Sequence, residues 1–445
     1  MLLKLLSVSK PVQVCLGHGQ RLSGGVSDDG QGRVTIEASV SQADPITVEG
    51  ASADIDPLMQ QAAERAFAAF DPTNYVIYLR AKGRMDEAMT AAERNFALAT
   101  TPLDVADALA LWANSDSNRR RAIVRALLAT QAFPKGWGGW FEAAMASRDL
   151  GHDEAALTYS LQMIQTRTGD QWRNHRAAQA GLRYGTRLRI DQWLADYGRL
   201  ERDLAQAPSN DLLTPSARYL MRMSAPLGRH NCAEAERERG FAETLGQAPG
   251  AAAADARWRL AVCSNDWPAA LQAAQDQSAA DRGPSGLTNV HAPALQASLD
   301  QPRIALSLAR IGRLADARAL IAATPLDCYY CVRTRGAVAA LAGQAGEADH
   351  WYAEAARQAP SLAFAHQEWG EARLARGDLD GAQAAFMEAA RRAPRWADPD
   401  KGLGDVAARR SRWRDALAAY DKALGEAPAW AELKRARASA AAHVN

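Results

Sequence analysis

The sequence has no uninterrupted apolar run of about 18 residues, the length that a membrane-spanning helix needs. Neither sign of charge dominates, because 52 lysines and arginines are balanced by 51 aspartates and glutamates. That balance argues against the uniformly basic surface of an obligate polyanion binder. We therefore expect no membrane span and no nucleic-acid partner.

Signatures of catalysis and of metal binding are missing as well. The eight histidines are scattered, with no H-E-x-x-H motif and no pair four positions apart. There is no P-loop and no G-x-S-x-G nucleophile motif. The sequence predicts a protein that is not an enzyme, with no catalytic residue, no metal and no cofactor.

What the chain does contain is alanine. Hydrophobic residues make up 48% of the chain, but aromatic residues only 7%. Alanine is the best helix former, and its small side chain lets helices approach closely. This composition predicts stacked helices over most of the length.

The first 54 residues have a different pattern. Residues 33–40 alternate apolar and polar side chains, and residues 46–48 continue the alternation after a turn at 43–45, which predicts a β-hairpin. Residues 12–16 could add a third strand. The glycine-rich stretch that precedes residue 33 indicates a flexible loop, marked by Gly24, Gly25, Gly30 and Gly32. Because two strands alone are marginal in water, the hairpin either packs on the helices or belongs to a truncated domain of a longer protein.

A secretory signal is not expected at the start. Lys4 and Lys10 interrupt the short apolar stretch of residues 1–16, whereas a signal peptide needs a continuous apolar core. The compartment stays open on this basis, with the cytoplasm slightly favoured and the periplasm as the alternative.

From residue 55 onward the chain repeats a short sequence pattern, a turn followed by an acidic or polar residue and alanine. It occurs at residues 83–92, 151–160, 265–274 and 312–321. Near the C-terminus, five landmarks recur with a step of 34 residues. They are Gly336, Gly370 and Gly404; Ala348, Ala382 and Ala416; Tyr352, Phe386 and Tyr420; Ala355, Ala389 and Ala423; and Pro360, Pro394 and Pro428. This period with these landmarks resembles the tetratricopeptide repeat family, bacterial type.

The resemblance implies an all-α, right-handed superhelical solenoid of helical hairpins, with the short β-hairpin at its N-terminus. The glycines then lie in the first helix of each pair, where the second helix crosses closely. The expected organisation is an N-terminal segment over 1–54, degenerate repeats over 55–165, irregular helical repeats over 166–328, three well-formed repeats over 329–430 and a capping helix over 431–445. Breaks are expected at 208–216 and 281–293, where glycine and proline cluster.

Such a solenoid implies a concave groove lined by the first helix of each pair, and we expect a partner peptide or protein to bind there. The groove candidates are Tyr330, Arg333, Phe364, Gln367, Glu371, Leu374, Asp398, Lys401, Asp405 and Arg409. The Lys and Asn residues of the carboxylate-clamp subclass are not reproduced at the matching positions. The expected function is a protein–protein interaction scaffold. The alternative is the helical sensor or regulatory region of a larger signalling or transcription-regulating protein.

Four of the five cysteines are candidates for disulfides. Cys232 and Cys263 are close to one repeat apart, so they could meet across adjacent hairpins in an oxidising compartment. Cys328 and Cys331 have the C-x-x-C spacing and could pair locally, which leaves Cys15 unpaired. A redox-active dithiol at Cys328 and Cys331 is the further alternative, although the residues before it read as a helix end and a turn.

Overall fold

The computed structural model describes residues 12–15, 21–40, 44–166, 176–206, 215–245, 250–282 and 291–444. Most of the segment 1–16 and of the two expected breaks at 208–216 and 281–293 lies outside these residues. Within the described part of the chain, no helix combines the length and the apolar character needed to cross a membrane.

The N-terminal segment is an antiparallel sheet with the strand order β1-β2-β3-β4. The strands are β1 (Val12–Cys15), β2 (Arg21–Asp28), β3 (Arg33–Val40) and β4 (Ile46–Ala51). The loop expected around Gly24 and Gly25 is wrong, because both residues lie within β2 and pair with β3. Only Leu22 and Val26 of β2 add apolar side chains to the buried clusters, so the glycines between them concealed the strand in the sequence.

Helix α1 (Ile55–Phe70) covers one face of this sheet. Its Met59 and Ala62 join Ile36 and Val48 in one buried cluster. The sheet therefore hides its apolar face against the helix, which satisfies the requirement that a small sheet pack on another element.

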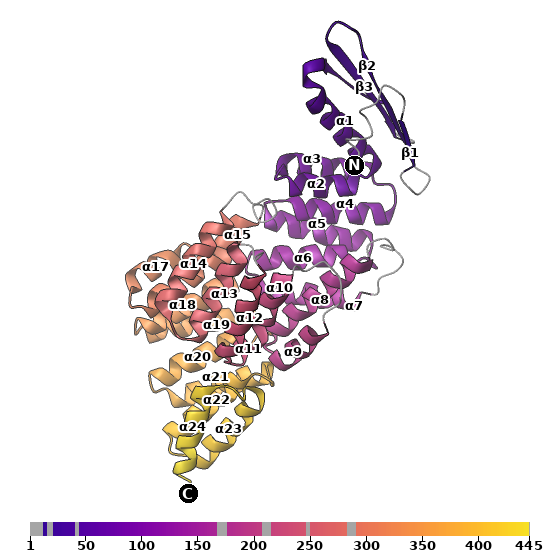
Figure 1. Cartoon of the computed structure of the whole chain (residues 1–445). Helices are drawn as coiled ribbons and strands as arrows, with labels where there is room; N and C mark the ends of the chain where they lie inside the picture. The colour runs from indigo at the N-terminus through magenta and orange to yellow at the C-terminus, as the bar shows by residue number, and fades with distance from the viewer. Residues whose placement is uncertain are drawn as a thin grey trace.

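The rest of the chain is a solenoid of helices, which confirms the predicted fold class (Figure 1). Up to residue 205 the helices are α2 (Pro72–Ala81), α3 (Met85–Leu98), α4 (Pro102–Ser115), α5 (Arg119–Ala132), α6 (Gly138–Asp149), α7 (Asp153–Gln165), α8 (Arg176–Trp193) and α9 (Tyr197–Ala205). Short α10 (Pro215–Arg222) and α11 (Ser224–Gly228) lead to α12 (Cys232–Thr244), α13 (Gly250–Cys263) and α14 (Trp267–Asp281). A further bent stretch consists of α15 (Ala292–Leu295), the π-helix η4 (Gln296–Asp300) and α16 (Gln301–Arg310), before α17 (Leu314–Ala322).

The last repeats form three regular hairpins and a final helix. They are α18 (Tyr329–Leu341) with α19 (Ala345–Gln358), α20 (Phe364–Ala375) with α21 (Leu379–Arg392), α22 (Ala397–Arg409) with α23 (Trp413–Glu426), and then α24 (Ala431–Ala442). A Cβ at Gly370 would lie 2.6 Å from the Phe386 ring, and one at Gly404 would lie 2.4 Å from the Tyr420 ring. The glycines are thus required where an aromatic ring of the second helix crosses the first.

The irregular region also consists of hairpins, which the sequence landmarks did not reveal. The turns inside several regular hairpins contain a glycine with positive φ, as at Gly151 and Gly343. In three turns of the irregular region the equivalent left-handed position is occupied by Ala195, His230 and Asn265, whereas the turn before α17 keeps a glycine, Gly312. Because glycine is the usual residue there, the missing glycines concealed a spacing of about one repeat.

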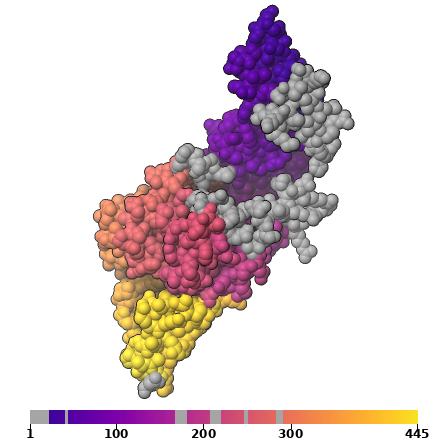
Figure 2. Space-filling view, viewed as in Figure 1, coloured from indigo at the N-terminus to yellow at the C-terminus, as the bar shows by residue number. Residues whose placement is uncertain are grey.

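The superhelix brings distant hairpins side by side. In Figure 1 the helices α13 to α19 lie on one side of α5 to α8, with α10 and α12 between the two groups, and the yellow C-terminal helices form the lower end. Figure 2 shows the same arrangement as a solid body from which the indigo N-terminal unit projects. Helices that are far apart in the sequence therefore line the same part of the concave side.

Candidate functional site: a concave chamber

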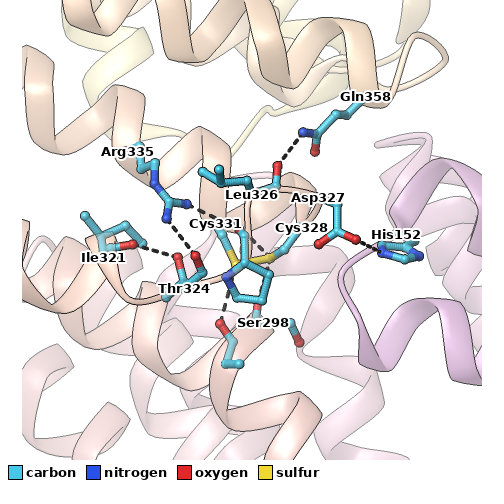
Figure 3. The surroundings of a disulfide bond; sticks show 12 residues. His152, Ser298, Ile321, Thr324, Leu326, Asp327, Cys328, Cys331, Arg335 and Gln358 are labelled. Carbon is cyan, nitrogen blue, oxygen red and sulfur yellow. Dashed lines mark hydrogen bonds and ion pairs between the residues drawn. A yellow bond between two sulfur atoms is a disulfide. The ribbon is translucent and has the colours of Figure 1, made fainter. Parts of the chain in front are cut away.

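Early and late parts of the chain are in contact where the turn between α6 and α7 meets the start of α18. Tyr329 N donates a hydrogen bond of 2.8 Å to the carbonyl of Gly151. A Cβ on Gly151 would lie 2.7 Å from Cys328 Sγ, so glycine is needed here both for its positive φ and for the close approach. His152 Nε2 lies 3.0 Å from Asp327 across the same contact (Figure 3).

A buried carboxylate joins the same two parts of the chain from the inside. Asp149 lies within 3.1 Å of Arg119 Nε, 2.8 Å of Arg148 Nη2 and 2.6 Å of His291 Nδ1. Burial alone would raise the pKa of Asp149, but the His291 hydrogen bond and the neighbouring positive charges lower it well below its usual range. Ser298 Oγ also donates to the Asp149 carbonyl, at 2.8 Å. The early helices are thus tied to the stretch around η4.

Between these walls lies a chamber of about 980 Å³. Its charged lining includes the arginines Arg148, Arg189, Arg259, Arg303 and Arg333 and the aspartates Asp153, Asp255 and Asp281. Its aromatic lining consists of Trp193, Tyr197, Trp258, Tyr329, Tyr330 and Phe364. A groove of about 560 Å³ adjoins it, with Tyr330 and Val262 contributing to both. Concave, mostly pre-formed cavities with converging polar groups are the usual form of binding sites.

Most arginines of the chamber are held by carboxylates and rings. Arg333 pairs with Glu368, with Nε 3.1 Å from Oε2, and lies 5.1 Å from the Phe364 ring centroid. Arg303 Nη1 lies 2.6 Å from Asp255 Oδ1, and Arg303 Cζ lies 4.3 Å from the Trp258 ring centroid. These contacts fix the guanidinium groups in position, with their charges largely compensated.

Arg189 differs from these residues. Its Nη1 lies 3.2 Å from the sulfur of Met145, and no carboxylate among the described residues pairs with it. Burial, and then repulsion from Arg148, lowers the pKa of Arg189 to about 9. Arg189 is half-buried, and its side chain lines the chamber.

The structure brings together only part of the predicted groove set. Tyr330, Arg333 and Phe364 line the chamber, and Glu371 lines the adjoining groove beside Tyr330. Gln367 is buried and donates to Glu371 at 3.0 Å.

The remaining groove candidates lie elsewhere or are engaged within the chain. Leu374 packs against the cluster that contains Phe386, and Arg409 is exposed outside both cavities. Lys401 Nζ lies 2.9 Å from Asp405 and 3.0 Å from Glu432. Asp398 Oδ1 lies 2.9 Å from His230 Nε2. The distal groove is therefore partly filled by this chain itself.

The four disulfide candidates lie in two adjacent pairs. The sulfur atoms are 1.97 Å apart in Cys232 and Cys263 and 2.05 Å apart in Cys328 and Cys331. Cys328 and Cys331 are fully buried where α18 meets η4. Cys328 precedes the first turn of α18, and its sulfur accepts a hydrogen bond from Cys331 N. The side chain of Cys15 lies outside the described residues.

Sequence reasoning missed Arg189, Asp149 and His291. None of them belongs to a motif or a regular repeat, and their importance arises from contacts between hairpins that are far apart in the sequence. For the irregular region, the usable signal in the sequence would have been a residue at each hairpin turn that takes the positive-φ position usually held by glycine.

No protein-family model matches the chain, and a comparison with curated proteins finds no relative. Among solved structures, the chain is similar to one described as the crystal structure of the APC/C hetero-tetramer Cut9-Hcn1, with 13% identity, a TM-score of 0.35, and 87% of this chain and 88% of that chain covered. It is also similar to the crystal structure of yeast Tom70, with 12% identity, a TM-score of 0.28, and coverage of 83% and 96%. Scores this low carry no argument about function.

Proposed function

We propose that the chain is a non-enzymatic protein-interaction scaffold that binds a partner peptide or protein on its concave side. The observation that carries this proposal is the concave chamber of about 980 Å³ with its adjoining groove of about 560 Å³. Their combined volume exceeds what a typical small ligand needs, whereas an extended or helical peptide segment would occupy both.

The lining supports a peptide as the ligand. Tyr330 lies where the chamber and the groove meet, and Phe364 and Trp258 supply further ring surface. Aromatic side chains beside charged groups are typical of interfaces in which the rings provide affinity and the charges provide specificity. We place the binding face at Tyr330, Arg333, Phe364 and Glu371. The distal positions Asp398, Lys401, Asp405 and Arg409 are left out of this face.

Site-specific photo-crosslinking tests the proposal. Tyr330 is replaced by a photo-crosslinking phenylalanine analogue, and the protein is irradiated in the cells that naturally express it. Met387, which is 56% exposed on α21 and lines neither cavity, receives the same analogue as the matched control.

We expect a discrete crosslinked protein from position 330 and none from position 387. The crosslink should disappear when Ala337, which lines the groove, is replaced by Trp, because the added ring fills the space. Equal crosslinking from both positions, or none from position 330, would contradict the assignment of the concave face.

A further inference from the structure

The pairing of the arginines inside the chamber with carboxylates is incomplete at one residue. Among the lining arginines, Arg148, Arg259, Arg303 and Arg333 each have a carboxylate partner, namely Asp149, Asp255, Asp255 and Glu368. Arg189 has no carboxylate partner among the described residues, and its nearest polar contact is the sulfur of Met145. The chamber thus contains one uncompensated guanidinium.

A half-buried charge without a counterion is costly. Water and a carboxylate are the usual partners of a guanidinium, and restricting access to both destabilises the charged form. Arg148 adds repulsion from α6, and its own charge is shared with Asp149. A bound anion would remove this cost, so the chamber favours a ligand that carries a negative charge.

The surroundings of Arg189 offer further contacts to such a ligand. Gln192 and Trp193 follow on the same helix and line the chamber with it. Ser224 and Arg259 face the same space, with Arg259 Nη1 3.3 Å from Ser224 Oγ. These four residues supply an amide, a hydroxyl, a second guanidinium and a ring within one wall. Such a set can orient a charged group and pack an adjacent apolar side chain.

We propose that Arg189 binds a carboxylate of the partner peptide, either an acidic side chain or a chain terminus. The inference rests on the proposed peptide-binding function and deepens it by assigning the charge of the ligand. A single unpaired positive charge matches the single charge of a carboxylate, and the planar guanidinium can hold both of its oxygens. A phosphate carries close to two negative charges and would need a second cation. Arg259 faces the same space but already pairs with Asp255, so a carboxylate is the better match.

The test compares fluorescein-labelled pools of random nonapeptides by fluorescence anisotropy. The first pool has a central Glu and an amidated end, the second a central Gln and an amidated end, and the third a central Gln and a free terminal carboxylate. A fourth has a central phosphoserine and an amidated end. Each pool is titrated with wild-type protein, Arg189→Gln, Arg189→Lys and Arg187→Gln. Arg187 is the matched control because it lies two positions away on α8, is exposed and lines neither cavity.

Wild type should bind the first or the third pool about tenfold more tightly than the second, the size expected for one charged hydrogen-bonded pair. If the first pool binds most tightly, the ligand group is a side-chain carboxylate. If the third pool binds most tightly, it is the carboxylate of a chain terminus. Arg189→Gln should abolish this preference, Arg189→Lys should retain part of it, and Arg187→Gln should retain all of it.

Three results would overturn the inference. Equal binding of the first three pools by wild type would do so while leaving peptide binding intact. A preference for a carboxylate that survives Arg189→Gln would show that another residue binds it. Tightest binding of the phosphoserine pool, lost in Arg189→Gln, would show that Arg189 binds a phosphate instead. Failure of every pool to bind would overturn the peptide-binding function itself.

Stability without ligand provides an independent readout. A residue kept for binding should cost stability in the free protein, so Arg189→Gln should melt at the same temperature as wild type or higher. Arg187→Gln should leave the melting temperature unchanged. A clear fall for Arg189→Gln alone would assign Arg189 a structural role and overturn the inference.

Discussion

His230 lies face to face with Trp430, with ring centroids 3.6 Å apart and ring planes inclined by 9°. His230 occupies the left-handed turn between α11 and α12, whereas Trp430 immediately precedes α24. The same imidazole places Nε2 2.9 Å from Asp398 Oδ1, and the neighbouring Arg229 donates from Nε to the Glu426 carbonyl at 2.7 Å. A turn in the middle of the chain therefore occupies the concave side of the last repeats.

This contact should depend on pH. Burial by itself lowers the pKa of His230, but the charge of Asp398, with Glu371 and Glu432 nearby, raises it overall. A raised folded-state pKa means that the stabilisation is fully present below the unfolded value of about 6.5 and is lost as pH rises through the folded value. We expect His230→Asn to cost about 1–2 kcal/mol at pH 6 and clearly less at pH 9, measured by urea unfolding.

Asn is chosen because it tolerates positive φ, so the turn is kept. The control is His443→Asn: His443 also stacks on a tryptophan, with its centroid 3.9 Å from that of Trp413, but no carboxylate among the described residues pairs with it. A cost for His230→Asn that is equal at both pH values would show that stacking alone holds the contact.

Gly370 should be intolerant of even the smallest side chain. Its Cβ would lie 2.6 Å from Phe386, which is fully buried between α20 and α21. Gly370→Ala is expected to lower the unfolding free energy by about 1–3 kcal/mol through overpacking. Gly346, on α19, has open space at the Cβ position, so Gly346→Ala should be neutral or stabilising by up to about 1 kcal/mol. Equal effects of the two substitutions on thermal melting would contradict the assigned packing.

Substitution of Asp149 should strongly destabilise the fold. Its partners Arg119 and His291 would be left as unpaired buried groups, and breaking such a cluster typically costs about 3–5 kcal/mol. Asp149→Asn should show this loss at pH 7. Because the pKa of Asp149 is lowered in the folded protein, the ionised carboxylate contributes its full stabilisation above about pH 4. The higher unfolding free energy of wild type is lost as the pH falls through the pKa of Asp149 in the folded protein.

Asp380 provides the comparison for Asp149, because its side chain is 99% exposed and pairs with Arg410 at the surface. Asp380→Asn should change the unfolding free energy by less than about 1 kcal/mol. Chemical unfolding of both variants at pH 7 and at pH 3 checks the prediction. A cost for Asp149→Asn no larger than that for Asp380→Asn would rule out the proposed tie between α6 and η4.

The two cysteine pairs predict a thiol count. Protein from an oxidising compartment should expose one thiol on denaturation, that of Cys15, and five after reduction. Replacing Cys232 and Cys263 together by alanine should cost about 3–4 kcal/mol, because their bridge closes a loop of 31 residues. Five free thiols in protein taken from its natural compartment would reject both pairs there.

Local features of the repeats could be predicted from the sequence. The 34-residue spacing of Gly336, Gly370 and Gly404 placed these glycines on the first helix of each hairpin, where the structure has them. The alternation in residues 33–40 likewise predicted β3. These features depend on contacts within one hairpin or between neighbours, so the pattern of side-chain sizes along the chain determines them.

The closure of the superhelix was decided by the tertiary structure alone. It depends on small rotations that accumulate over many hairpins, including irregular ones whose turns carry Ala195 and His230 in place of glycine. That accumulation brings Gly151 against Tyr329 and His230 against Trp430, and it leaves Arg189 unpaired inside a chamber. No local pattern encodes these pairings, because each joins residues whose separation exceeds the period of the repeat several times over.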